Sequence, residues 1–111
     1  MNTQGWMRSL MTRNMAEEDF IEHVAELLGR EFDMEASTIK QKGTFIVKLG
    51  IYTTNIPLTV LSTLKSRGPY CLDRFILDQY RIQAFQFDLY RSQYIRYCYG
   101  LFHSTAAGST Y

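Results

Sequence analysis

A seven-residue repeat runs through the C-terminal part of this chain. Its positions follow one another at alternating steps of four and three residues, which places their side chains on one stripe of an α-helix. All but one of these side chains are apolar or aromatic, so the stripe needs a covering surface. The pattern predicts one continuous helix over residues 70–102. The stripe, which we also predict to be an interface, consists of Ile76, Tyr80, Gln83, Phe87, Tyr90, Tyr94, Tyr97 and Leu101.

The length of this predicted helix constrains what covers it. A helix of that size is about 48 Å long, whereas a compact chain of 111 residues has a diameter of roughly 35 Å. Three arrangements reconcile these lengths: a break near Gln83 and Ala84, two other helices stacked end to end along it, or a second copy of the chain. We expect the third arrangement, a homo-oligomer and most simply a dimer.

Two shorter helices are predicted before it. In residues 15–32, apolar side chains recur at helical spacing, acidic residues fill the first turn, and Asn14 can cap the start with Glu17 reaching back. A second helix begins near Asn55, with Pro57 in its first turn, and ends at Gly68.

The segment between these helices alternates apolar and polar residues and is rich in β-branched side chains. We interpret it as a short β-hairpin with its bend at Lys42 and Gly43; a helix is the alternative. The predicted fold is therefore mainly α, a three-helix bundle-like domain with a long C-terminal helix and a hairpin between helices 1 and 2. An all-α fold is the alternative. The domain covers residues 15–103, between an N-terminal arm (1–14) and a polar tail (104–111). Met1, Met7, Met11 and Met15 all remain candidate start residues.

Charge is distributed unevenly although the formal net charge is only +1. Residues 16–35 carry eight acidic side chains and one basic one, whereas residues 36–67 carry five basic side chains and no acidic one. One interpretation pairs the two segments inside the fold; the other directs the basic segment at an anionic partner such as nucleic acid. The candidate nucleic-acid-binding residues are Lys40, Lys42, Lys48, Lys65 and Arg67.

Residues suited to catalysis or metal binding are sparse. His23 lies near Asp19 and Glu26 on one helix, but no second helix offers matching ligands, so we predict no metal and no cofactor. On one long helix, Cys71 and Cys98 are too far apart to form a disulfide, which favours reduced thiols and a cytoplasmic location. No apolar run of membrane-spanning length is present.

These observations predict a small non-catalytic interaction or regulatory protein that self-associates through the repeat stripe or binds a partner protein there. One alternative is a nucleic-acid-binding module that uses the basic segment. Another is a small-ligand sensor with a pocket lined by the tyrosine and glutamine side chains of the last helix.

Overall fold

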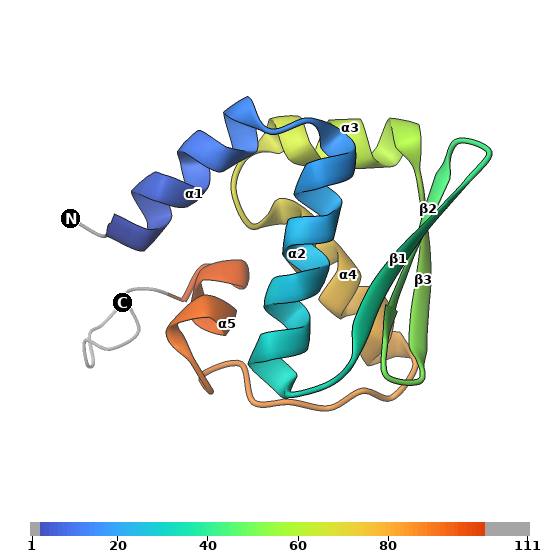
Figure 1. Ribbon diagram of the computed structural model, residues 1–111. Helices are drawn as coiled ribbons and strands as arrows, with labels where there is room; N and C mark the ends of the chain where they lie inside the picture. Colours follow the sequence, from blue (N-terminus) through green and yellow to red (C-terminus); the bar gives the residue numbers. More distant parts are fainter. Residues whose placement is uncertain (1–2, 102–111) are drawn as a thin grey trace.

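The computed structural model describes residues 3–101, except for the side chains of residues 3–7 and 11 (Figure 1). The predicted tail 104–111 lies outside the described residues. The elements are α1 (Thr3–Asn14), α2 (Glu17–Phe32), β1 (Ala36–Gln41), β2 (Thr44–Leu49), β3 (Tyr52–Pro57), α3 (Leu58–Arg67), α4 (Cys71–Ile82) and α5 (Gln93–Cys98).

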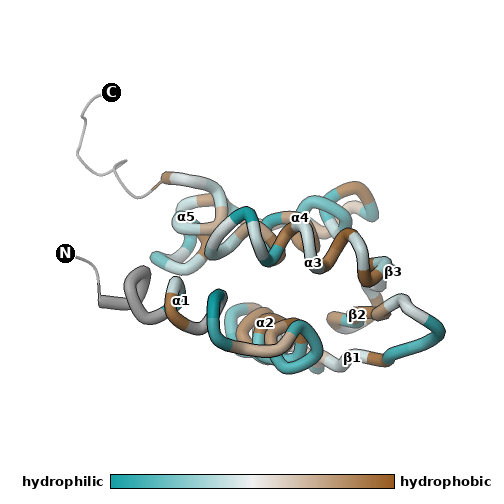
Figure 2. The backbone as a smooth tube through the Cα atoms, turned by 90° about the horizontal axis from the view of Figure 1, so that it is seen from above, coloured by the Kyte–Doolittle hydropathy of each residue, from teal (hydrophilic) through white to brown (hydrophobic). Residues whose placement is uncertain are grey.

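The three strands form one antiparallel sheet in the order β1-β2-β3. All the labelled helices lie on one side of this sheet in Figure 1. Seen from above in Figure 2, α1 and α2 form one row of helices, α3, α4 and α5 form another, and the sheet lies at one end of both. The predicted fold class is therefore wrong: the chain is an α+β domain with a three-stranded sheet and is not a helical bundle.

The core lies between the sheet and the two rows of helices. In β2, the side chains of Phe45, Val47 and Leu49 are buried, and they alternate with more exposed residues as expected for a sheet covered on one face. Helices contribute the rest of the cluster, whose fully buried members include Phe20, Ile21, Val24, Leu28, Leu61, Leu72, Ile76, Leu77, Tyr80 and Ile95. The other face of the sheet carries the directly paired Ile39 and Ile46 among mostly polar side chains.

The hairpin prediction is confirmed. β1 and β2 pair from Ala36↔Leu49 to Gln41↔Thr44, which leaves Lys42 and Gly43 as a two-residue turn. Both turn residues have positive φ (41° and 77°), as a type I′ turn requires, and this turn matches the right-handed twist of the strands. The predicted first helix is also present as α2, but its N-cap is Ala16 and no side chain caps it.

Asn55, the predicted cap of the second helix, lies instead within a third strand. Thr54 and Ile56 in β3 are buried while Thr53 and Asn55 are exposed, so this strand follows the same two-residue alternation as β2. Pro57 ends β3 and serves as the N-cap of α3, with φ −60°, where a missing N–H group costs no hydrogen bond.

The predicted long C-terminal helix is wrong, since α4 ends at Ile82. The amide of Phe85 donates to the carbonyl of Tyr80, and the amide of Ala84 donates to that of Arg81. These two bonds form a Schellman motif, which closes a helix with one residue in the left-handed conformation. Ala84 is that residue (φ 76°). A non-glycine residue pays roughly 1–2 kcal/mol there, which tertiary contacts of the following residues must offset.

Those contacts come from the aromatic side chains of the connection between α4 and α5. The Phe85 ring lies 4.9 Å from that of Phe32 at the end of α2 and 4.8 Å from that of Tyr52 in β3. The Phe87 ring lies 5.3 Å from that of Phe32. A continued helix would carry these rings away from α2 and β3, so packing favours the break.

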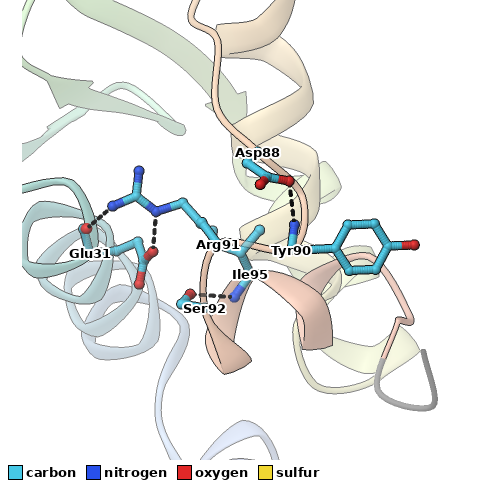
Figure 3. Close-up of polar contacts among 6 residues, drawn as sticks. All are labelled: Glu31, Asp88, Tyr90, Arg91, Ser92 and Ile95. Carbon is cyan, nitrogen blue, oxygen red and sulfur yellow. Dashed lines mark hydrogen bonds and ion pairs between the residues drawn. The ribbon is translucent and has the colours of Figure 1, made fainter. Parts of the chain in front are cut away.

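Polar contacts hold the second half of the same connection (Figure 3). Arg91 Nε donates to Glu31 Oε2 at 2.7 Å and Arg91 Nη2 to the Glu31 carbonyl at 3.0 Å. Asp88 Oδ1 accepts from the Tyr90 amide at 2.9 Å. Ser92 caps α5 by accepting from the Ile95 amide at 3.1 Å. The connection is thus fixed to α2 before α5 begins.

Candidate functional site

The residues of the repeat stripe do not form one external surface. Ile76, Tyr80 and Tyr94 are buried within their own chain, and the Tyr80 hydroxyl donates to the Val47 carbonyl at 2.8 Å. Gln83 Nε2 donates to the Thr53 carbonyl at 2.8 Å, so this amide contacts the free edge of β3. Phe87, Tyr97 and Leu101 are half-buried, and Tyr90 is 53% exposed. The stripe as a whole is therefore unavailable to a partner.

The basic segment is dispersed over the fold. Lys40 lies 3.7 Å from Glu18 in an exposed ion pair with α2, as the first interpretation of the charge pattern requires. Lys42 is at the hairpin turn, and Lys48 belongs to the outer face of the sheet. Lys65 and Arg67 are in the last turn of α3. The structure does not gather these five residues into one patch.

A buried ionic cluster connects three helices instead. Asp73 in α4 is fully buried, and its two carboxylate oxygens accept one hydrogen bond from Arg8 Nη2 of α1 and one from the Tyr94 hydroxyl of α5. The Arg8 guanidinium also lies 5.1 Å from the Phe20 ring and 4.7 Å from the Tyr70 ring. We call this set the Arg8–Asp73–Tyr94 cluster.

Burial and neighbouring charges shift the ionisation of this cluster. Burial acts to lower the pKa of Arg8, but the charge and hydrogen bond of Asp73, together with Tyr94 and Tyr70, act to raise it, and the pKa is raised. Burial, together with Asp73, raises the pKa of Tyr94 well above its ordinary value. Burial also raises the pKa of Tyr70 to about 12. The cluster therefore keeps Arg8 charged and both tyrosines neutral, which suits anchoring of α1 rather than proton transfer.

Alkaline pH should unfold the protein because its buried tyrosines resist ionisation. Tyr70 ionises near 10 in the unfolded chain and at about 12 in the folded one, so the unfolded state loses its proton first. Stability is then fully present below pH ~10 and falls as the pH rises towards ~12. Urea unfolding at several pH values, with tyrosinate absorbance recorded in parallel, checks this. A free energy of unfolding that is flat across this interval would contradict the assignment.

The sequence contains one signal for this cluster, the position of Asp73. Asp73 precedes Ile76, Leu77 and Tyr80 by three, four and seven residues, so it lies on the buried face of its own helix. Basic residues alternate with Asp73 in the sequence, and that pattern by itself is typical of a solvated helix face. Arg8 carried no signal, since nothing local distinguishes it from a surface arginine.

The other candidate groups for chemistry are not arranged for it. Burial raises the pKa of the Cys98 thiol strongly, which leaves it protonated and a weak nucleophile. Burial and the positive charge of Arg8 lower the pKa of His23. Cys71 is a free, half-buried thiol. Within residues 3–101, no three side chains of the metal-ligating types are placed to hold an ion.

Two isoleucines stand out among the exposed side chains. Ile51 is 86% exposed at the turn between β2 and β3, and Ile82 is 78% exposed at the end of α4. Both lie within two residues of the contact between Thr53 and Gln83, and Figure 1 shows this turn beside the end of α4. They therefore share one end of the molecule.

A groove of about 500 Å³ adjoins Ile82. Phe85 and Phe87 from the fixed connection line it, together with Asp78 and Arg81 of α4. Asp78 lies within 4 Å of both Arg74 and Arg81 and accepts from the Tyr99 hydroxyl at 2.7 Å, so this group of charges beside the groove has a net charge of +1. We call the set formed by Ile51, Ile82, Phe85 and Phe87 the Ile51–Ile82 surface, and it is the candidate site.

Comparison with known proteins assigns no family. No family model, no curated protein and no solved structure matches this chain significantly. Among the described residues, no helix combines the length and apolar character needed to cross a membrane.

Proposed function

We propose that this protein is a small non-catalytic interaction module that self-associates through the Ile51–Ile82 surface. The observation that carries the proposal is a protruding isoleucine beside a groove lined by phenylalanines. Exposed apolar groups gathered in one place are typical of interaction sites.

A second copy of the chain is the occupant that this surface favours. A two-fold dimer contact must be self-complementary, and here a knob, Ile82, lies next to a groove that can receive the same residue of a partner. Asp78 offsets one of the two arginine charges beside it, so a net charge of only +1 on each copy opposes the contact. The two free cysteines support a cytoplasmic location as part of the same proposal.

Substitution of Ile82 by lysine should abolish self-association. A two-fold dimer buries this side chain twice, and each burial contributes about 1.5–3 kcal/mol, so we expect the dissociation constant to rise at least about a hundred-fold. Lysine suits the C-terminal end of α4, where positive charge is favoured, so the monomer should stay folded. Light scattering over a range of concentrations measures the change from the dimer towards the 13.0 kDa monomer.

Ile39→Lys is the matched control, because Ile39 is also exposed but lies on the outer face of the sheet. It should self-associate like the parent. A parent that stays at 13.0 kDa at every concentration, or a dimer that only Ile39→Lys disrupts, would refute the proposed surface.

A further inference from the structure

A second concavity lies between α1, the start of α2 and the end of α3, and it shares no lining residue with the groove beside Ile82. Its volume is about 640 Å³, within the range of small-molecule sites. Most of the residues that line it have polar side chains, and they include Arg13, Glu17, Lys65 and Ser66. We call it the α1–α3 cleft.

Two of the residues that line this cleft, Arg13 and Lys65, are cations. Neither Arg13 nor Lys65 forms an ion pair with any described residue. Both occupy the last turns of their helices, where they balance the helix dipole. That role accounts for only part of the charge of these two side chains. A helix end is equivalent to about half an elementary charge, whereas α3 ends with two cations, Lys65 and Arg67. With the Glu17 carboxylate included, the side chains that line the cleft have a net charge of +1.

Glu17 and Ser66 of the cleft are arranged to accept hydrogen bonds. Ser62 Oγ donates its proton to Glu17 Oε2 at 2.7 Å, and Ser66 Oγ donates to the Thr63 carbonyl at 3.1 Å. A hydroxyl has only one proton to donate, so Ser66 offers a ligand its oxygen lone pairs, and Glu17 offers its carboxylate. These groups are suited to the hydroxyl groups of a ligand and not to its anionic end.

We propose that the α1–α3 cleft binds a small polyhydroxylated anion. Arg13 and Lys65 bind its phosphate or carboxylate group, while Glu17 and Ser66 accept hydrogen bonds from its hydroxyl groups. Charge-assisted bonds from an arginine fork and a lysine ammonium are the usual means of holding such anions.

Thermal unfolding with four probes tests both halves of this proposal. Glycerol 3-phosphate and glycerate combine an anionic group with hydroxyls, inorganic phosphate has only the anion, and glycerol has only the hydroxyls. At constant ionic strength and about 10 mM probe, we expect one of the first two to raise the Tm by about 3 °C or more. The better of the two identifies the anionic group, and the last two probes should have smaller effects.

Substitutions of single cations then locate the site. Lys65→Gln and Arg13→Gln should each weaken binding about ten-fold, whereas Lys42→Gln, a cation at the hairpin turn, should bind like the parent. Amide chemical-shift changes should be confined to residues 9–17 and 62–69. The proposal is overturned if no probe raises the Tm, if inorganic phosphate or glycerol equals the combined probes, or if all three variants respond alike. Because the cleft and Ile82 are tested by different variants, either proposal can fail alone.

Discussion

Replacing Asp73 with alanine is expected to lower the free energy of unfolding by about 3–5 kcal/mol. The substitution leaves the buried Arg8 guanidinium without its counter-ion and removes the acceptor of the Tyr94 hydroxyl. An unpaired charge in a water-excluded site costs more than the pair contributes when complete. Urea unfolding followed by circular dichroism measures the loss.

Asp88→Ala is the matched control, since Asp88 is exposed and its carboxylate accepts a hydrogen bond from the nearby Tyr90 amide; we expect it to cost less than about 1 kcal/mol. Removing both charges, as in Arg8→Met with Asp73→Leu, should recover much of the loss. Equal stabilities of Asp73→Ala and Asp88→Ala would show that the cluster does not anchor α1.

Replacing Ile76 with alanine should lower the free energy of unfolding by about 2–5 kcal/mol, through lost burial and the cavity that remains. Ile76 is fully buried in the core of its own chain, although the sequence pattern predicted it to lie at an interface. A core location and an interface location of Ile76 predict different effects of protein concentration on this loss of stability. A core residue gives the same loss at every protein concentration, whereas an interface residue gives a loss that varies with concentration. Unfolding at two concentrations distinguishes them.

Ile82→Ala provides the control for that experiment, because Ile82 is 78% exposed. Under conditions in which the protein is monomeric, we expect a change within about 0.5 kcal/mol. A small loss for Ile76→Ala, or one that depends on concentration, would place this residue outside the core.

Where the fold agreed with the sequence, the determinants were local. The first helix was recognisable from its apolar spacing and from Glu17 and Glu18 in its first turn. The hairpin turn was recognisable because Gly43 adopts positive φ without strain between two alternating segments. Such signals depend on neighbours a few residues away, so the sequence displays them directly.

Where the fold differed, distant contacts outweighed local preference. Residues 83–92 keep the heptad spacing, yet Phe85 and Phe87 pack on Phe32 instead of extending α4. Asn55 suits a helix cap, yet its segment pairs with β2. Phe32 lies more than fifty residues before Phe85 and Phe87 in the sequence. The partner of Asn55 is nearer, since Asn55 pairs with Ile46 in β2, but a strand pair of this kind is stable only as part of a larger sheet or packed on helices.

The residues of the two candidate sites are likewise brought together by the tertiary structure. Ile51 and Ile82 are thirty-one residues apart, and tertiary contacts, among them those of Thr53 with Gln83 and of Tyr52 with Phe85, bring their segments together. The cations of the α1–α3 cleft come from two helices separated by the whole sheet in sequence. Charge alone makes Lys65 a candidate for nucleic-acid binding, and nothing in the sequence places Arg13 beside it.

The amino-acid sequence by itself determined the parts held by hydrogen bonds and apolar spacing within a few residues: α2, the turn at Lys42 and Gly43, and the end of α3 at Gly68. Tertiary structure alone decided the third strand, the end of α4 at Ile82 and the burial of Asp73 against Arg8. The reason is energetic. Propensities differ by less than about 1 kcal/mol per residue for most residues, whereas burying one aromatic or pairing one buried charge is worth more.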